Sequence, residues 1–417
     1  MRLKTIMLAG AAGLLALPAF AAPAAAPKDA KVWAAVEAAK PGELKLLEQV
    51  VDIDSGTGDV AGGRKIAAIL SERLKALGFS IESVKAEADG LPENTVATLT
   101  GTGKGRVLLI GHIDTVFEPG TAAKRPFRMD ADKAYGPGVS DEKGGVVEGV
   151  TALTILHDQG FKDFKQIVFL IETSEERGSP GTRQLIDKLV KDADVELNME
   201  PGDTPDVMTV WRKGSASFQI SVAGRAAHAG IAPQEGRNAA EELIHQLKAD
   251  EVFPKTGDGL TVNLTLMQAG TRANIIPDVA SATLNVRVRD KADLENVFAT
   301  LQKNAATTLI PDTKVTVSRE PSFPPLAENP GTQALAAKAE AIYAGIGKTI
   351  TRGGNGGASE SALAYESGIP ALDGLGPAAG GFHSASEYLL LDSVAPRLYL
   401  LTKLIQDLGH QPPPRLK

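Results

Sequence analysis

Residues 106–114 read RVLLIGHID: a strand-like run, 106–110, leads directly into a glycine, a histidine and an aspartate. A short apolar run that ends in glycine and polar residues is typical of a buried strand and the loop after it. The chain downstream alternates between helical spacing and further apolar runs, at 144–159 (helix), 166–171 (strand), 181–191 (helix) and 195–199 (strand). Strands separated by helices predict an α/β fold with a mostly parallel sheet covered by helices on both faces.

The same pattern extends towards both ends of the chain. Helical spacing recurs at 32–53 and 63–77, where the second predicted helix stops at Gly78, and again at 333–345. Residues 370–375 have the pattern of one more core strand.

The pattern changes near Arg212. Half-exposed strands and amphipathic helices then follow in the order βαββαβ, at 217–222, 238–248, 261–267, 280–289, 291–307 and 314–319. This order is that of a ferredoxin-like α+β unit. We therefore expect residues 28–210 and 323–414 to form one α/β domain, with residues 211–322 as a separate domain inserted into it.

The composition excludes several classes of protein and of site. With 417 residues, 43% of them hydrophobic, the chain is too long and too apolar to be disordered. Its net charge of -7 lacks the basic excess of a nucleic-acid-binding surface. Because the chain has no cysteine, a disulfide scaffold, a thiol nucleophile and a zinc site built on sulfur are excluded, and a metal would need His, Asp and Glu ligands.

The N-terminus has the pattern of a cleaved export signal. Arg2 and Lys4 precede the apolar residues 6–17, and residues 19–21 (AFA) fit the small-x-small cleavage rule. The apolar stretch is shorter than a membrane span of about 20 residues. We expect a signal peptide at 1–21, export to a bacterial periplasm or out of the cell, and no membrane attachment after cleavage. The alternative, a buried N-terminal helix, is disfavoured by this order of charged, apolar and small residues.

Polar side chains follow the predicted strands at the points where the strands end. His112 and Asp114 follow the strand at 106–110, and Glu200 follows the strand at 195–199. Other acidic and imidazole groups follow a strand or lie in glycine-rich loops: Asp141, Glu172, Glu175, Glu176 and His383. Because ligands gather at the carboxyl ends of strands in an open α/β sheet, we expect these groups to lie close together.

Crowded carboxylates repel one another unless some are protonated or a cation lies among them, and a dication with His, Asp and Glu ligands meets that need. Side chains two apart on an extended segment point the same way, so Asp114 could hold the second nitrogen of His112. The side chains of Glu175 and Glu176 diverge, so one could bind metal and the other take a proton from bound water. Each short motif alone is more often a solvated turn, and only their shared position favours a metal site.

Two further features leave alternatives open. His228 lies in the small-residue run 226–230 (AAHAG) of the inserted domain, which allows the close approach of a ligand but also fits a simple turn. The glycine run 353–357 (GGNGG) is too loose for a dinucleotide-binding motif and could instead offer backbone N–H groups to an anionic substrate.

Seven segments carry a family resemblance in the same order along nearly the whole chain. They are 111–116 (GHIDTV), 135–145 (YGPGVSDEKGG), 172–179 (ETSEERGS), 200–201 (EP), 224–229 (GRAAHA), 274–277 (NIIP) and 382–384 (FHS). With them the chain resembles the dizinc carboxypeptidase/aminoacylase family of metallopeptidases. This family includes glutamate carboxypeptidases (glucarpidases), aminoacylases and succinyl-diaminopimelate desuccinylases, and the best overall resemblance is to the glutamate carboxypeptidases.

The resemblance implies two Zn²⁺ ions per chain, with Co²⁺ or Mn²⁺ as substitutes. The implied ligands are His112 and Glu200 for one zinc, Glu176 and His383 for the other, and Asp141 as the bridge between them. Asp114 would orient His112, and Glu175 would be the general base that deprotonates the bridging water.

The resemblance also implies a substrate site and a partner. His228 looks like the oxyanion histidine of the family, which the inserted domain contributes across a dimer interface. Asn274 and Arg287 look like the residues that bind the free carboxylate of the substrate, with the backbone near Gly357. The implied fold is a zinc-binding catalytic α/β domain with an inserted α+β lid through which two chains form a homodimer.

The implied activity is hydrolysis of a C-terminal amide bond in a small molecule with a free carboxylate. Glu200, in place of aspartate, resembles the carboxypeptidase and acyl-amino-acid side of the family. We expect release of glutamate or a similar amino acid from N-acyl, peptide or folate-type substrates, although Ser359-Glu360 departs from the usual Ser/Thr-Asp near the glycine loop. The alternatives are an aminoacylase, deacylase or dipeptidase, and a binding protein with a vestigial metal site.

Overall fold

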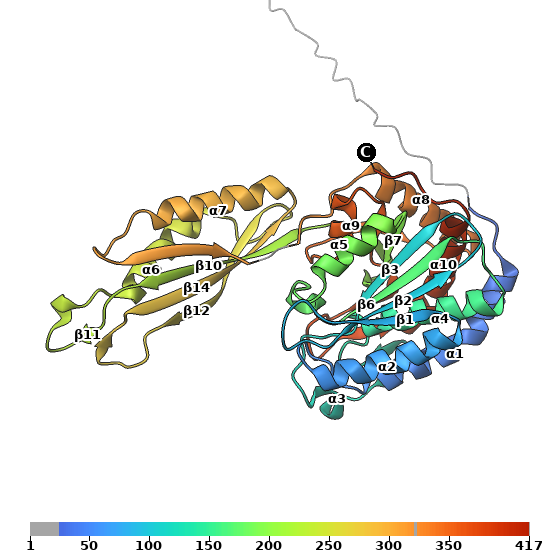
Figure 1. Ribbon diagram of the computed structural model, residues 1–417, viewed down its shortest axis with the longest axis horizontal. Coiled ribbons are helices and arrows are strands. Elements are labelled where there is room, and N and C mark those ends of the chain that lie inside the picture. Colours follow the sequence, from blue (N-terminus) through green and yellow to red (C-terminus); the bar gives the residue numbers. More distant parts are fainter. Residues whose placement is uncertain (1–24, 321–322, 417) are drawn as a thin grey trace, which may run out of the picture.

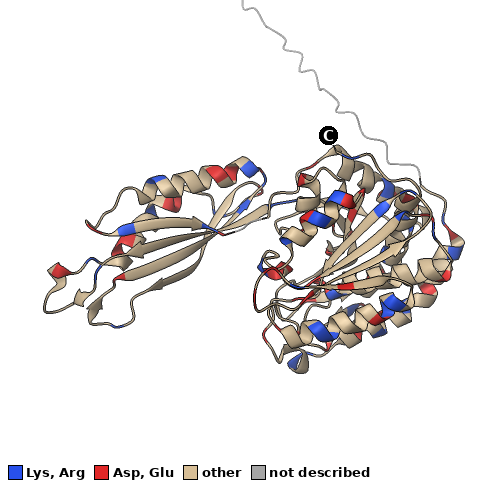
Figure 2. Cartoon of the chain, in the orientation of Figure 1, with Lys and Arg blue, Asp and Glu red and all other residues tan. Residues whose placement is uncertain are grey.

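The computed structural model describes residues 25–320 and 323–416, and the predicted export signal lies outside them. Figure 1 shows a larger α/β unit and an elongated unit formed by the middle of the sequence. Within the described residues, none of the helices combines the length and the apolar composition needed to cross a membrane. Figure 2 shows Lys and Arg interspersed with Asp and Glu along the helices of both units.

The central sheet of the larger unit has six strands in the order β1-β2-β6-β3-β7-β17. Their bounds are β1 (Ser80–Val84), β2 (Asn94–Thr100), β3 (Arg106–His112), β6 (Gln166–Glu172), β7 (Val195–Asn198) and β17 (Ala371–Leu372). The four strands predicted from the sequence are β3, β6, β7 and β17, and they run parallel. The antiparallel strands β1 and β2, which the sequence pattern does not predict, extend one edge of this sheet.

Helices cover both faces of this sheet. The helices of the larger unit are α1 (Ala30–Val51), α2 (Val60–Ala76), α3 (Thr121–Lys124), α4 (Lys143–Asp158), α5 (Arg183–Asp192), α8 (Pro330–Gly345), α9 (Ser361–Glu366) and α10 (Leu391–His410). α4 and α10 pack on β3 from one side, and α5 and α9 cover the other side. Gly78, the predicted stop of α2, has a φ of 89°, a left-handed conformation that glycine adopts at little cost.

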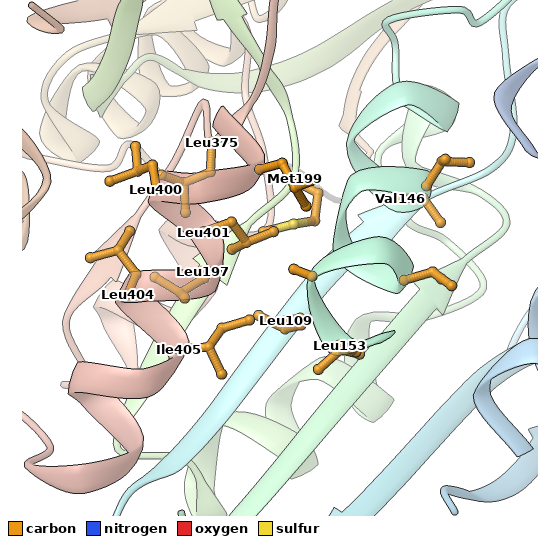
Figure 3. Close-up of a cluster of buried hydrophobic side chains, with 14 of the residues drawn as sticks. Leu109, Val146, Leu153, Leu197, Met199, Leu375, Leu400, Leu401, Leu404 and Ile405 are labelled. Carbon is orange, nitrogen blue, oxygen red and sulfur yellow. The ribbon is translucent and has the colours of Figure 1, made fainter. Parts of the chain in front are cut away.

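The main hydrophobic core lies where α4 and α10 meet the central sheet. Figure 3 shows Leu109 of β3 and Leu197 of β7 beside Leu153 of α4 and Leu401 of α10. All four of these side chains are buried. Burying a leucine side chain contributes about 1.5–3 kcal/mol, so this layer fixes the strands whose ends carry the polar groups.

A second sheet, which the sequence pattern does not predict, lies on the other side of α4 and α10. Its order is β16-β9-β8-β18-β19-β5-β4. The bounds are β4 (Arg128–Met129), β5 (Lys133–Tyr135), β8 (Pro201–Asp203), β9 (Val207–Arg212), β16 (Thr351–Asn355), β18 (Gly376–Gly380) and β19 (Tyr388–Leu390). β9 ends at Arg212, two residues beyond the predicted domain boundary, because it pairs along its length with β16.

The elongated unit has the predicted ferredoxin-like order. Its elements are β10 (Gly214–Ala223), β11 (Ala227–His228), α6 (Ala239–Ala249), β12 (Thr261–Ala269), β13 (Ile275–Ile276), β14 (Val279–Val288), α7 (Lys291–Ala305) and β15 (Lys314–Arg319). The strands form an antiparallel sheet in the order β12-β14-β10-β15, and α6 and α7 share a separate hydrophobic core with it. The short β11–β13 ribbon lies at the end of this unit far from the larger one (Figure 1).

One buried side chain opposes the stability of the larger unit. Glu148 on α4 is fully buried, and neither of its carboxylate oxygens has a hydrogen-bond partner among the described residues. Burial raises the pKa of Glu148 well above its usual value, and the nearby Glu43 raises this pKa further. A folded-state pKa above the unfolded one favours folding at low pH, and that contribution is lost as the pH rises above about 4.3.

We therefore expect Glu148→Met to raise the free energy of unfolding by about 1–3 kcal/mol at pH 8, and by less at pH 5, because methionine has no charge to desolvate. Urea unfolding of both proteins at the two pH values measures the difference. Glu37→Met, at an exposed position of α1, is the matched control. An equal effect of Glu148→Met at both pH values would show that Glu148 does not change its protonation on folding.

Candidate metal centre

Five of the predicted side chains converge at the carboxyl ends of the central strands. His112 is the last residue of β3, and Glu200 follows β7. Asp141 lies in the loop before α4, Glu176 in the 3-10 turn η1 (Glu175–Arg177) after β6, and His383 in the loop between β18 and β19. Five segments that are far apart in the sequence thus supply one cluster of imidazoles and carboxylates.

Asp141 lies between the two imidazoles. Its Oδ1 is 3.3 Å from Nε2 of His112, and its Oδ2 is 3.2 Å from Nε2 of His383. Each imidazole also faces a carboxylate of its own: Glu200 Oε1 is 3.6 Å from His112 Nε2, and Glu176 Oε2 is 3.1 Å from His383 Nε2. The cluster therefore has two halves that share one carboxylate.

The donor atoms of this cluster fit a metal. Nε2 of His112 is fully buried and has no hydrogen-bond partner among the described residues, so its lone pair needs a cation or a proton. Single donor atoms of His112, Asp141 and Glu176 lie within 4.8 Å of one another, as do those of His112, Glu142 and Glu200. Imidazole nitrogen and carboxylate oxygen are the ligands that zinc, cobalt and manganese accept where no thiolate is present.

The electrostatics of the cluster show that protons compete for the same atoms. Burial lowers the pKa of His112, but its contacts with Asp114, Asp141 and Glu200 outweigh this and raise the pKa well above 6.5. Asp141 and Glu176 raise the pKa of His383 to about 10, and burial raises that of Glu176 to about 7. A metal ion that binds here must displace protons from the metal-free protein.

Asp114 has a wider role than the predicted one. Nδ1 of His112 lies 3.0 Å from the backbone oxygen of Asp114, closer than the 3.4 Å to its carboxylate. A carbonyl oxygen can only accept, so Nδ1 carries the proton of a neutral ring and Nε2 keeps the lone pair. The Asp114 carboxylate accepts hydrogen bonds from the backbone N–H groups of Glu175 (3.1 Å) and Glu176 (3.3 Å), and so it holds the turn that bears both.

Glu175 lies beside the candidate metal ligands. Its Oε2 is 3.9 Å from Nε2 of His112. Burial raises the pKa of Glu175 well above 4.5, and the charge of Glu360 raises this pKa further. A carboxylate with a raised pKa next to a metal position is suited to accept and return a proton.

Two glutamates that support the cluster are missing from the set predicted from the sequence. Glu142 Oε2 accepts a hydrogen bond from the backbone N–H of His112 at 2.9 Å. Glu387 accepts from the backbone N–H groups of Gly138, Ser140 and Asp141, and thereby fixes the loop of the shared carboxylate. Glu142 lies within the segment 135–145 that carries the family resemblance, whereas Glu387 lies outside every such segment.

A cavity of about 530 Å³ opens in front of the cluster, where the two units meet. Glu175, Glu176 and His383 lie on one side of it, and Arg287 of β14 lines the wall that belongs to the inserted unit. Arg287 donates from Nε to Asn285 Oδ1 at 3.1 Å. The volume suits a small molecule, and the guanidinium offers a partner for an anionic group.

The structure separates the predicted substrate-binding residues. Gly357 lines the cavity as Arg287 does, but its N–H donates to Asn355 Oδ1 at 2.7 Å and is not free for a substrate. Asn274 lies beside the β11–β13 ribbon, where its backbone oxygen accepts from Ala229. Within one chain, Asn274 is therefore remote from the cavity that Arg287 and Gly357 line.

His228 lies on the same remote ribbon as Asn274, exposed to solvent. Its Nδ1 accepts hydrogen bonds from the N–H groups of Gly230 (3.1 Å) and Ile231 (3.2 Å). With Nδ1 as an acceptor, the proton of the neutral ring is on Nε2. A single chain therefore presents His228 as an outward-facing donor rather than as part of its own cavity.

Comparisons with known proteins show several similarities over most of the chain. The family model described as peptidase family M20/M25/M40 matches residues 108–407. Carboxypeptidase G2 of Pseudomonas sp. (strain RS-16) is 36% identical over 387 residues, covering 92% of this chain and 93% of the relative. Succinyl-diaminopimelate desuccinylase of Methylobacterium radiotolerans is 27% identical, over 76% of this chain and 85% of the relative. The crystal structure of a tripeptidase from Staphylococcus aureus superposes with a TM-score of 0.72 at 22% identity, over 89% of this chain and 99% of that one.

Proposed function

The chain belongs to peptidase family M20/M25/M40 and is a metallopeptidase, and we propose that it is a dizinc carboxypeptidase. The proposed reaction is hydrolysis of a C-terminal amide bond, with release of glutamate or a similar amino acid from N-acyl, peptide or folate-type substrates. The observation that carries the proposal is the position of Asp141, with one carboxylate oxygen towards each of two imidazoles. Two imidazoles that share one carboxylate in this way suit a pair of metal ions, with Asp141 as the ligand that the two ions would share.

Different residues of this chain would bind the metal ions and transfer the proton during hydrolysis. His112 and Glu200 would hold one metal ion, Glu176 and His383 the other, with Asp141 between them, and the bound metal supplies Lewis acidity and a water of lowered pKa. Glu175 would take a proton from the attacking water and return it to the leaving amine nitrogen.

The cavity supports a substrate with a free carboxylate. Arg287 is a cation on the part of the cavity wall that the inserted unit supplies, and its planar guanidinium can hold a carboxylate through two hydrogen bonds. The similarity to carboxypeptidase G2 also supports cleavage at the C-terminal end of the substrate. The similarity to a desuccinylase supports the second candidate, an aminoacylase or deacylase that uses the same residues on other small N-acyl amino acids.

A panel of acyl-glutamates, acyl-arginines and dipeptides tests the proposal, with the methyl esters of the same compounds as matched controls. The proposal expects the highest kcat/KM for an acyl-glutamate and a large loss on esterification, because the ester cannot pair with Arg287. Faster turnover of acyl-arginines or dipeptides would favour the second candidate. Equal rates for acids and esters would contradict recognition of the carboxylate.

We also propose that two chains form a homodimer through the inserted unit. β12 is an edge strand, and it leaves Leu264, Leu266 and Met267 exposed by 46%, 65% and 45%. Exposed apolar residues on an unpaired strand edge favour association with another chain. Such a dimer could bring the ribbon with His228 and Asn274 to the cavity of the partner subunit, where the two residues would serve as oxyanion donor and carboxylate ligand.

Leu266→Lys should convert the dimer into monomers and lower kcat by about 10²-fold, because a charge on the shared edge opposes pairing and an oxyanion donor is lost. Light scattering coupled to size-exclusion chromatography measures whether the protein is a dimer or a monomer, and steady-state kinetics measures kcat. Ile244→Lys, at another exposed apolar position of the same unit, is the control. A fully active monomer would contradict the shared site.

A mixing experiment tests the contribution of His228 directly. Chains with Glu175→Gln and chains with His228→Ala should each have low activity alone. Mixed dimers should regain part of the wild-type activity. One of their two sites combines Glu175 of the His228→Ala chain with the intact His228 of the Glu175→Gln chain. No recovery in mixed dimers would mean that His228 does not act across the interface.

The proposed location is the periplasm or the cell exterior, because residues 1–21 have the pattern of an export signal. Protein recovered from a bacterial host that exports it should begin at Ala22 and be found in the periplasmic or extracellular fraction. N-terminal sequencing of that protein checks the cleavage, and a mature chain that retains Met1 would contradict it.

A further inference from the structure

Arg212, the last residue of β9, links a metal ligand to the second sheet. Its side chain is almost fully buried and lines the cavity. Nε donates to Oδ2 of Asp373 at 2.8 Å, and NH2 donates to Oδ1 of the same carboxylate at 2.6 Å. The same NH2 also donates to Oε2 of Glu200 at 3.1 Å. One guanidinium thus joins Asp373 to the carboxylate of Glu200.

The position of this guanidinium is fixed on several sides. Asp373 is fully buried and accepts a further hydrogen bond from the hydroxyl of Ser359, and its backbone oxygen accepts from the N–H of Thr209. A Cβ built on Gly357 would lie 3.3 Å from NH1 of Arg212, so the absence of a side chain there leaves room for the guanidinium. A paired, buried arginine of this kind has little freedom to move.

The hydrogen bond from Arg212 leaves one oxygen of Glu200 available to bind a metal ion. Oε2 is occupied by Arg212, whereas Oε1 faces Nε2 of His112 at 3.6 Å. The two oxygens are therefore not equivalent, and Oε1 is the one that faces the His112 imidazole. Partners outside the ligand shell that orient a ligand commonly change metal affinity by about 10–100-fold.

We propose that Arg212 is a positioning residue that holds Glu200 with one oxygen towards the metal and thereby sets the zinc affinity of the buried half of the centre. The inference rests on the proposed dizinc function. Within the described part of the chain, neither Glu176 nor His383 of the other half forms a hydrogen bond or ion pair with Arg212, and the side chain of His383 is 56% exposed. The two halves are therefore separable by experiment.

Arg212→Lys is the informative variant. Lysine keeps the positive charge, so the electrostatic effect on a nearby dication is largely preserved, but it lacks the fork that reaches Asp373 and Glu200 at once. Arg352→Lys is the matched control, because Arg352 also makes a two-point contact with a carboxylate, that of Glu340, on the neighbouring strand β16 and outside the cavity.

The experiment titrates metal-free full-length protein with Zn²⁺ against a chromophoric zinc chelator. The wild type should bind two ions, Arg212→Lys should weaken one of the two affinities by about 10–100-fold and leave the other within about twofold, and Arg352→Lys should change neither. Two unchanged affinities, or an equal loss at both, would overturn the proposal. A wild type that binds no zinc would instead contradict the proposed function.

A second arm separates positioning from a general effect on folding. In chains that carry Glu200→Ala, the further change Arg212→Lys should leave the remaining zinc affinity unchanged, since no carboxylate remains to be held. Removal of a contact partner abolishes the coupling between two residues. A further loss of zinc affinity in that background would show that Arg212 acts through the fold rather than through Glu200.

Discussion

Glu175→Gln should lower kcat by about 10³-fold while both zinc ions remain bound, because the amide cannot accept the proton of the attacking water. Glutamine has nearly the same shape as glutamate and keeps a hydrogen-bonding side chain at this position. Glu175 is not a member of either group of donor atoms suited to a metal, so the metal content should not change. Steady-state kinetics together with metal analysis of the same samples measures both quantities.

The control for this variant is Glu118→Gln, an exposed glutamate outside the cavity. It should leave kcat and zinc content as they are in the wild type. Glu175→Gln with more than about a tenth of the wild-type kcat would remove Glu175 as the general base, since acid–base catalysis typically contributes 10²–10⁴-fold. Loss of zinc from Glu175→Gln would instead make Glu175 a ligand.

Asp141→Ala should remove zinc from both positions and reduce turnover to the uncatalysed background. Asp141 is the one carboxylate of the cluster that faces both imidazoles, so its loss leaves each half of the centre one ligand short. A metal position with too few ligands loses most of its affinity. Zinc content after dialysis should fall from about two ions per chain to near zero, measured by atomic emission.

His383→Ala provides the contrast to Asp141→Ala, because His383 faces only Asp141 and Glu176. It should cost one zinc ion per chain and leave the buried half occupied. Asp130→Ala, at an exposed acidic residue, should cost none. Equal losses from Asp141→Ala and His383→Ala would contradict the bridging position of Asp141.

The parallel strands of the larger unit and the inserted unit could be predicted from local sequence pattern. The strands β3, β6 and β7 are apolar runs between helices, and the alternation from β10 to β15 is regular. The second sheet could not be predicted in this way. Its strands are two to six residues long, β4 is exposed, and β18 is buried by its contacts with α4 and α10 rather than by a periodic pattern of its own. The sequence pattern does not predict α10 either, because Pro396 lies within the helix.

The convergence of the candidate metal ligands could be predicted because the ends of strands place them, and the strands are recognisable as apolar runs. His112, Asp141, Glu176, Glu200 and His383 meet for that reason. Arg212 and Glu387 could not be found, since each acts on a residue distant in sequence through the tertiary fold. Asn274 was grouped with Arg287 by the resemblance, and only the structure shows that the inserted sheet holds the two apart within one chain.

The most direct test of the proposed dizinc centre is anomalous diffraction from crystals of the zinc-loaded protein, collected above the zinc absorption edge. The account predicts two peaks per chain, about 3.5–4 Å apart, on either side of the Asp141 carboxylate. One peak should adjoin Glu200 and the other Glu176. A single peak, no peak, or peaks remote from Asp141 would contradict the account.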